Sequence, residues 1–387
     1  MLSFVLSSLP LQPGLVDDDE QVPDLQPDDD EDIQPWMIDE EEYEFGGTED
    51  DRLHAQQVTE FVQSLGPVEH EERLACMKAS FGIPPEPQRY IYFETLPEST
   101  RNQRHTGDLC WHEYHRMSNL SETSLPPMRY SLCNEPPGPD KCLHEPSPIL
   151  QIFNMKLQTC LEDVTSPVEV YGVFAVRDGE DYCRNYLFNR SRENPLDIRH
   201  TGGYIRLLGP KRGMSMKFNC LFEVDLRIKA IGDDRDDKTL VDGCRELTEG
   251  QVCYEMLYRY TSSSLYGSLA FDVIIFRDGV EATIQLDFVE VPEDGFHIQM
   301  CGYTTIGKHY YAFIDKSCEC DSFIRSTGRL PQYFVAAMQM GDYFLVDLME
   351  GKAPLTFRSA LHGTDEKYYY FHNGALVSVK VSWSVTF

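Results

Sequence analysis

A two-residue alternation of apolar and polar side chains is the feature that most limits what this sequence can form. In LFEVDLRIKAI (221–231), every second residue from Phe222 to Ile228 is apolar and the residues between them are charged. VEATIQLDF (280–288) and LVSVKVSWSVTF (376–387) alternate in the same way. Because successive side chains of a strand point to opposite faces of a sheet, this pattern predicts half-buried antiparallel strands whose polar side faces water.

About a dozen runs of this kind lie between residues 149 and 387, separated by Gly, Pro and Asp. The pattern predicts an all-β fold over residues 148–387, either one large antiparallel β-sandwich or two packed sandwich-like halves. FEVDLRIK (222–229) is echoed by FLVDLMEGK (344–352), and VRDGE from position 176 is echoed by FRDGV from position 276. The two offsets differ by 22 residues, so the echoes suggest a duplication without establishing one.

Residues 168–195 combine a strongly apolar first half with a highly charged second half. VEVYGVFAV predicts a strand that is buried on both faces, Asp178-Gly179 predicts a turn, and YCRNYLF predicts the returning strand. We expect the charged residues here, including Arg177 and Arg184, to face water at turn and edge positions. In LGPKRG (208–213), Lys211 and Arg212 are expected on a tight turn, because the spacing is not that of a phosphate-binding loop.

The region before the predicted β domain divides into three parts. Residues 1–51 are expected to be disordered, because positions 17–51 hold 18 Asp and Glu and no Lys or Arg. Residues 52–81 predict a short helical segment, with Val58, Phe61, Val62 and Leu65 at helical spacing. Residues 82–147 are rich in Pro and are expected to be a connector.

The acidic tail contains one apolar segment, IQPWMIDEEEYEF, which has two interpretations. It is either part of a solvated tail that keeps the protein soluble, or a short partner-binding segment of the acidic-hydrophobic kind. The partner-binding residues would then be Trp36, Met37, Ile38, Tyr43 and Phe45.

Charge and hydropathy argue against several classes of protein. The net charge is −30, and outside the tail the remaining 64 − 18 = 46 acidic residues still exceed 34 basic ones. Such a surface repels phosphate, so we expect no binding to nucleic acid. The apolar runs are too short for a transmembrane helix. The N-terminus has no basic start and runs into acid, unlike a secretory signal, and the twelve cysteines are therefore expected as free thiols of a cytoplasmic or nuclear protein.

Three groups of residues invite a chemical hypothesis, and each is weaker than the structural alternative. Zinc would need four converging ligands, but Cys110, His112, His115, Cys133, Cys142 and His144 lack regular knuckle spacing, and Cys318-Glu-Cys320 has no second pair nearby. GDDRDDK (232–238) lacks the spacing of a calcium loop and is expected to be solvated. Glu113 and Arg116 lack the buried helix that an N-glycosidase pair needs. We therefore predict no metal, cofactor or catalytic residue.

Several motifs in a fixed order carry a resemblance to a known family. They are SLPPMRYS (124–131), LQIFNMKL (150–157), VYGVFAVRD (170–178), RNYLFNRSR (184–192), LGPKRG (208–213), FEVDLRIK (222–229) and VKVSWSV (379–385). Over residues 114–387 the chain resembles a large family of grass proteins that is labelled only as a domain of unknown function. The resemblance implies a plant protein with an all-β domain and brings no catalytic residue with it.

The leading hypothesis is a non-enzymatic protein-interaction module of a plant protein, with a role in stress or defence and an unknown protein partner. The alternative is a hydrolase, or a sandwich that binds metal or lipid, with a site built from distant loops. The sequence indicates neither the partner nor the oligomeric state. A pocket lined by residues with perturbed pKa values would favour the enzyme, and an apolar patch would favour binding.

Overall fold

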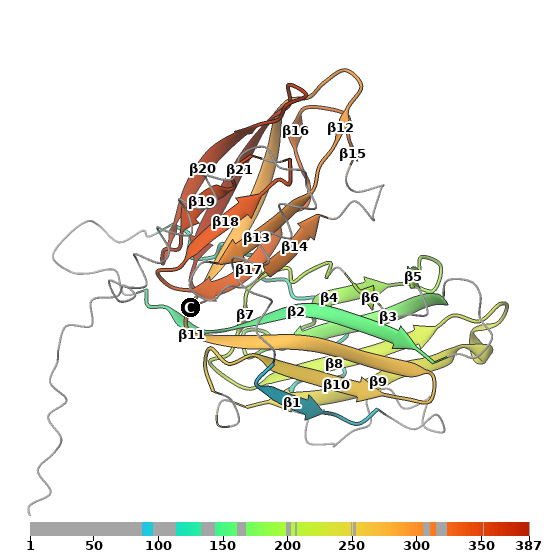
Figure 1. Cartoon of the computed structure of the whole chain (residues 1–387). Helices are drawn as coiled ribbons and strands as arrows, with labels where there is room; N and C mark the ends of the chain where they lie inside the picture. Colours follow the sequence, from blue (N-terminus) through green and yellow to red (C-terminus); the bar gives the residue numbers. More distant parts are fainter. Residues whose placement is uncertain are drawn as a thin grey trace, which may run out of the picture. The chain divides into compact units, whose positions relative to one another are not determined.

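The computed structural model describes residues 87–95, 114–132, 144–160, 168–198, 203–205, 207–248, 250, 253–304, 310–314, 323–350 and 352–386. The elements in these ranges are strands β1 to β21 and one short 3₁₀ turn, η2 (Asp234–Asp236). The predicted all-β class is therefore confirmed (Figure 1). The expected acidic tail and helical segment lie outside the described residues. Within the expected connector, residues 89–92 form β1.

The first half of the domain is a sandwich of two sheets. One sheet has the order β10-β11-β2, with β1 beside β10 and with β6 and β7 beside β2. The other has the order β4-β3-β8-β9, with β5 beside β3. Both contribute to one core, which includes Phe174, Phe222 and Phe271. The bounds are β1 (Arg89–Tyr92), β2 (Ser147–Thr159), β3 (Val168–Arg177), β4 (Asn185–Arg190), β5 (Leu196–Ile198), β6 (Gly203–Tyr204), β7 (Met214–Ser215), β8 (Cys220–Ile228), β9 (Lys238–Leu247), β10 (Tyr258–Ser263) and β11 (Gly267–Glu290).

The second half is another sandwich, with its own core around Phe344, Phe357 and Trp383. One sheet has the order β20-β21-β11, with β16 and β17 also beside β11, and the other has the order β14-β13-β18-β19. β12 and β15 form a separate two-stranded pair. The bounds are β12 (Phe296–His297), β13 (Met300–Thr304), β14 (Tyr310–Ile314), β15 (Phe323–Ile324), β16 (Gly328–Arg329), β17 (Phe334–Gln339), β18 (Tyr343–Asp347), β19 (Leu355–Arg358), β20 (Gly363–Tyr370) and β21 (Leu376–Ser384).

Strand β11 belongs to both sandwiches (Figure 1). Its odd-numbered residues from Leu269 to Ile275 enter the first core, and its even-numbered residues from Ile274 to Phe288 enter the second. Because a strand presents alternate residues to opposite faces, one strand can serve two cores on opposite sides of its sheet. The apolar positions predicted for 280–288 are confirmed, since Val280, Ala282 and the following even positions are all buried, but Glu281 and Thr283 on the side assigned to water are buried as well.

The two sandwiches share one strand order. Each main strand of the first sandwich has a counterpart in the second. The pairs, in chain order, are β2 and the second half of β11, β3 and β13, β4 and β14, β8 and β18, β9 and β19, β10 and β20, and the first half of β11 and β21. The short strands β6 and β7 correspond in the same way to β16 and β17. The echo of FEVDL in FLVDL relates Phe222 on β8 to Phe344 on β18, which are corresponding strands. The VRDG echo does not correspond, because it joins β3 to β11.

The predicted hairpin is present, but its charged residues do not face water. β3 and β4 pair antiparallel across a loop that begins at Asp178. Arg177, Asp178 and Arg184 are nevertheless buried, and so are Glu223 and Asp225 on the polar side of β8. The cause is residues 114–132, where Met117 packs on Leu221 and Cys244 on the same outer face of this sheet. A segment from outside the sandwich covers the face that the alternation assigned to solvent.

Gly172, at the middle of β3, gives a direct test of how closely β3 and β8 approach. Its φ is +120°, and a Cβ there would stand 2.0 Å from the carbonyl oxygen of Asp225. Gly172→Ala is expected to lower the free energy of unfolding by about 2–3 kcal/mol, measured by urea denaturation. Gly250→Ala is the matched control, because nothing lies within 4 Å of its Cβ position. Equal stability of the two variants would contradict the close approach.

Candidate functional site

A buried group of three charges lies between β3, β4 and β8. The Glu223 carboxylate accepts a hydrogen bond of 2.7 Å from Arg177 Nε and bonds from Arg184 Nε and Nη2. The side chains of Arg177 and Glu223 are fully buried. Burial opposes the charge on Arg184, but its hydrogen bond to Glu223 raises the pKa of this guanidinium above its usual value. Two guanidinium groups thus surround one buried carboxylate, and the charge-assisted hydrogen bonds between them join the ends of β3 and β4 to β8.

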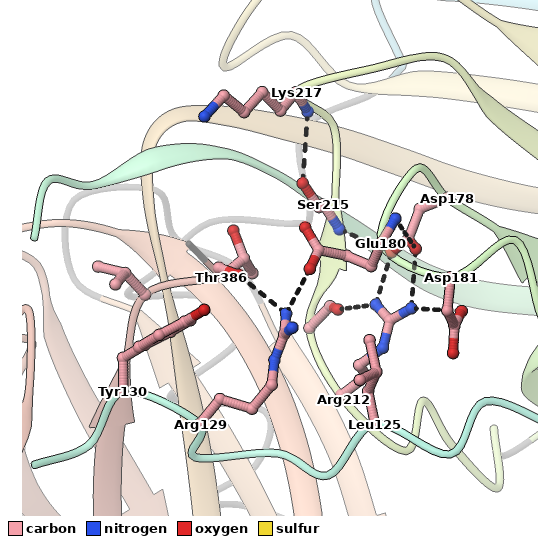
Figure 2. Close-up of polar contacts among 12 residues, drawn as sticks. Leu125, Arg129, Tyr130, Asp178, Glu180, Asp181, Arg212, Ser215, Lys217 and Thr386 are labelled. Carbon is pink, nitrogen blue, oxygen red and sulfur yellow. Dashed lines mark hydrogen bonds and ion pairs between the residues drawn. The ribbon is translucent and has the colours of Figure 1, made fainter.

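A second buried cluster centres on Arg212, and its members converge from three segments (Figure 2). Arg212 donates to both carboxylate oxygens of Asp178, at 2.6 and 2.8 Å, and to Asp181 at 3.2 Å. Asp178 Oδ2 also accepts the backbone N–H of Ser215 at 2.9 Å. Thr123 donates to Asp181 at 2.6 Å. Arg212 lies at a bend of the chain, and its guanidinium is bound by Asp178 and Asp181 inside the fold.

The cluster continues to the shared strand β11 through Glu281. This carboxylate accepts the backbone N–H of Gly213 at 2.6 Å and that of Met128 at 2.7 Å. Complete burial raises the pKa of Glu281, although the two N–H donors act in the opposite direction. Glu281 thus joins the 208–213 turn and the 122–131 segment to the strand that both sandwiches use.

Arg129 carries the connection to the C-terminal strand region. Its Nη2 donates to Glu180 at 2.7 Å and to the carbonyl oxygen of Thr386 at 2.8 Å, as Figure 2 shows. Beside it, the Tyr130 N–H donates to Ser384 at 3.0 Å. Glu180 follows β3 and Thr386 follows β21, so one guanidinium bridges the loops of both halves. We call residues 122–131 the clasp, because their hydrogen bonds connect the loops of the first sandwich to the C-terminal end of the second.

The residues considered for zinc are separated by the fold. His115 is buried, lies 3.0 Å from Glu246, and has its pKa lowered by burial against the opposing effect of Glu246. His144 instead packs against Tyr130 and His362. Cys110, His112, Glu113, Cys133, Cys142, Cys318 and Cys320 lie outside the described residues. Among the residues that are described, no group of three or more His, Cys, Asp or Glu could hold a metal ion.

The Asp-rich loop is anchored at its end and not simply solvated. Asp233 and Asp234 are exposed, but Asp237 is buried. Asp237 accepts hydrogen bonds from Arg192 at 2.8 Å and from Tyr171 at 2.6 Å. Burial would raise its pKa, but these hydrogen bonds lower the pKa of Asp237 to about 2. The Asp237 carboxylate is therefore already paired with a basic side chain, that of Arg192.

An extended segment, residues 88–95, lies along the edge strand β10. β1 pairs with β10 in parallel, with Ile91 beside Tyr260. The Gln88 N–H donates to the carbonyl oxygen of Leu257, and the Phe93 N–H donates to that of Thr261, both at 3.0 Å. Phe93 is buried in the first core, whereas Ile91 is only partly buried. This is a strand addition to the edge of an otherwise antiparallel sheet.

Comparison with known proteins assigns the chain to a family. Residues 149–381 match the family described as Domain of unknown function (DUF6598), and the chain belongs to it. The clasp and β1 lie before the matched region. The chain matches none of the curated proteins. No helix in the described ranges is long and apolar enough to cross a membrane.

Two kinds of solved structure resemble the chain distantly. Human GIVD cytosolic phospholipase A2, in complex with methyl γ-linolenyl fluorophosphonate and terbium chloride, is 10% identical over 62% of this chain, with a TM-score of 0.21. The chain covers 33% of that phospholipase chain. A structure of two C2 domains of extended-synaptotagmin 2 is 11% identical over 69% of this chain and 96% of its own, with a TM-score of 0.23. Similarity at this level identifies no activity.

Sequence reasoning missed the buried charges and the strand addition. Arg177, Arg184 and Glu223 look like surface residues because alternation alone does not reveal that another segment covers the outer face. The one available signal was the stretch SLPPMRYS, which precedes the alternating strands and forms part of the covering segment. The proposed partner-binding residues Trp36, Met37, Ile38, Tyr43 and Phe45 lie outside the described residues.

The buried triad predicts a strong asymmetry between removing one charge and removing all three. Glu223→Ala is expected to lower the free energy of unfolding by about 3–5 kcal/mol, because it leaves two buried guanidinium groups uncompensated. The triple variant Arg177→Met/Arg184→Met/Glu223→Leu should be more stable than Glu223→Ala, since apolar side chains replace the whole group. Urea denaturation measures both.

The control for the triad is Glu169→Ala, which breaks a partly exposed ion pair with Lys229 of 3.1 Å. Its cost should stay below about 1 kcal/mol. A Glu223→Ala variant no less stable than this control would show that the triad does not hold β3, β4 and β8 together.

Proposed function

We propose that this protein is a non-enzymatic interaction module that binds an extended segment of a protein partner by strand addition. The observation that carries the proposal is the parallel pairing of β1 with β10. The edge of the family domain accepts a strand from outside the domain, and the backbone hydrogen bonds of such pairing are independent of the side chains of the added strand.

The fit of β1 supports an exchangeable occupant. Three of its four residues are exposed, and Ile91 is its only partly buried side chain. Within these four residues the hydrophobic effect contributes little, and the adjacent Phe93, buried in the first core, is the main apolar anchor of the segment. A partner segment with a β-branched residue at the Ile91 position would compete with β1 for the same backbone groups of β10.

The acidic segment with Trp36, Met37, Ile38, Tyr43 and Phe45 is a second binding element in this proposal. Its mixture of acids and large apolar residues is typical of short segments that bind partners. We place the protein in the cytoplasm or nucleus of a plant cell, with a role in stress or defence. Free thiols at Cys160, Cys183, Cys220, Cys244, Cys253 and Cys301 support a reducing compartment.

The test is a pull-down from plant extract read by quantitative mass spectrometry, with three forms of the chain. They are the whole chain, the chain starting at Arg52, and the whole chain with Ile91→Asp. Strand addition predicts one partner that the first two forms both retain. Ile91→Asp should raise its recovery at least about threefold, because a buried charge loosens β1 and frees β10.

Tyr90→Asp is the matched control, since Tyr90 is the exposed neighbour of Ile91 on the same strand. It should leave recovery unchanged. A partner that is lost with the tail would place binding on the Trp36 segment. Recovery that is the same for Ile91→Asp and Tyr90→Asp would contradict strand addition at β10, and no enrichment with any form would remove the proposal.

A second candidate, binding to a lipid surface, rests on two exposed aliphatic residues. Ile231, between β8 and β9, and Leu265, between β10 and β11, are both largely exposed. The loop of Leu265 lies beside the start of β9, the strand that follows the loop of Ile231, because Ser264 donates to the carbonyl oxygen of Thr239 at 3.2 Å. Apolar side chains at adjacent loop tips fit the headgroup region of a bilayer.

The measurement for this candidate is flotation with phosphatidylcholine vesicles. If the loops insert, the chain should float with the vesicles and Ile231→Ser/Leu265→Ser should reduce the bound fraction about tenfold, since each buried aliphatic side chain contributes about 1.5–3 kcal/mol. Leu132→Ser, at another exposed leucine, is the control. Flotation that is unaffected by the loop substitutions would exclude this mode of binding.

A further inference from the structure

Each sandwich exposes a pair of tyrosines at its edge, in the pattern basic-Tyr-apolar-Tyr. In the first, Tyr90 and Tyr92 on β1 are 65% and 57% exposed. In the second, Tyr368 and Tyr370 on β20 are 53% and 64% exposed. The residue between each pair, Ile91 or Tyr369, points to the core. We call these the β1 platform and the β20 platform.

The geometry of a strand fixes how the rings lie. Residues two apart on one strand share a face and stand about 7 Å apart. The residue between the tyrosines anchors each platform, fully on β20 through Tyr369 and partly on β1 through Ile91, so the β1 platform exists only while β1 is paired with β10. A tyrosine has only two side-chain torsions to restrict, so a rigid pair offers flat aromatic surface at small entropic cost.

Hydrogen-bonding side chains continue the β1 platform across the sheet. Tyr90 is in register with Arg259, which is in register with Asp272. Arg259 binds Asp272 through two hydrogen bonds of 2.6 and 2.8 Å. The exposed row therefore begins with a tyrosine and continues with Arg259, whose guanidinium is held in place by the buried Asp272.

The row of the β20 platform has the same composition and is one strand longer. Tyr368 is in register with Ser378, Ser378 with Asp287, and Asp287 with Arg329. Arg329 lies 3.8 Å from Asp287, and both side chains are more than two-fifths exposed. Asp287 and Arg329 therefore present hydrogen-bond acceptors and donors to solvent two and three strands away from Tyr368 on the same sheet.

We propose that the two platforms bind a neutral polysaccharide, with sugar rings stacked on the tyrosines and sugar hydroxyls bonded to the partly exposed Arg259 near the β1 platform and to Asp287 and Arg329 near the β20 platform. The apolar C–H face of a sugar ring packs well on the face of a tyrosine ring. A sugar hydroxyl can accept a hydrogen bond from an Arg side chain and can donate one to an Asp side chain. This binding goes beyond strand addition, because it uses the outward face of the sheet and not its edge.

Charge and duplication decide the class of ligand. One Arg and one Asp cancel in each row, while the chain as a whole carries −30, so a polyanion is repelled and an uncharged polymer is not. Two similar tyrosine pairs in one chain suit a polymer that repeats the same unit, since linked sites gain avidity. A stable protein interface buries roughly 800 Å² per partner and has an apolar centre. The tyrosine rings instead have ion-paired side chains in their rows, so this surface suits a protein partner less well than a polysaccharide.

The test is affinity electrophoresis of the whole chain in native gels that contain mixed-linkage β-glucan, galactomannan or amylose. Polygalacturonate is the anionic control. We expect at least one neutral polymer to slow migration and polygalacturonate to have no effect. Tyr368→Ala/Tyr370→Ala and Tyr90→Ala/Tyr92→Ala should each weaken retardation about tenfold, and the fourfold variant should migrate freely.

Two further sets of variants separate stacking from folding. The corresponding Tyr→Phe variants keep the ring face and should retain affinity within about threefold. Leu265→Ala changes an exposed apolar residue outside both platforms and should have no effect. Urea midpoints equal to that of the unmodified chain confirm that the Tyr→Ala variants are folded.

Three results would overturn the proposal. The chain could migrate freely in all three neutral polymers, or the Tyr→Ala variants could be retarded as strongly as the unmodified chain. The third is loss of a protein partner from pull-downs by the Tyr→Ala variants without polysaccharide binding, which would make the tyrosine faces a protein site.

Discussion

The rest of the fold depends on one strand that buries opposite faces in two different cores. The first half of β11 gives odd-numbered residues up to Ile275 to the first sandwich, its second half gives even-numbered residues from Ile274 onward to the second, and residues 273–276 are buried on both faces. A charged side chain is therefore excluded from that stretch, and Arg277 and Asp278 follow immediately after it. Gly279 is required next, because a Cβ there would stand 1.9 Å from a methyl carbon of Ile149 on β2.

The two sandwiches have diverged most at their outer faces. At the offset of the first echo, Leu345 of the second sandwich corresponds to Glu223 of the first, and both side chains are buried. Glu223 is tolerated because Arg177 and Arg184 surround it, and residues 114–132 exclude water from this face. Burying an ion triad gains little over apolar packing. The covering segment is joined to the triad region through the backbone of Arg184, which accepts a hydrogen bond from the Thr123 N–H and donates to the Ser121 carbonyl oxygen, and the clasp in turn binds Glu281 through the Met128 N–H.

Local periodicity was sufficient for the class of fold and for the core positions of β8, β11 and β21. It also gave the hairpin of β3 and β4, and one of the two internal echoes joined corresponding strands. It failed for Arg177, Asp178, Glu223 and Arg212, because burial of a polar face is decided by a segment distant in sequence. The pairing of Arg129 with Glu180 and Thr386 joins segments far apart in the sequence and has no local signal. Whether Trp36 and its neighbours bind a partner stays a prediction.

Corresponding edges of the two sandwiches are protected from uncontrolled pairing in different ways. β10 is covered by β1, so its inward positions need no charged residue to prevent pairing, and they hold Tyr258 and Tyr260 in the core. β20 pairs with β21 alone among the described strands and places Asp365 and Lys367 at its inward positions.

Those two charges are accommodated locally. The Trp383 indole donates to Asp365 at 3.3 Å, and Lys367 lies over the Phe357 ring. Inward-pointing charges on an edge strand discourage pairing with another chain, because an added strand would cover them and remove their hydration. The charged edge of β20 is therefore closed to strand addition, whereas the apolar edge of β10 depends on an occupant. This difference is why strand exchange is assigned to the first sandwich.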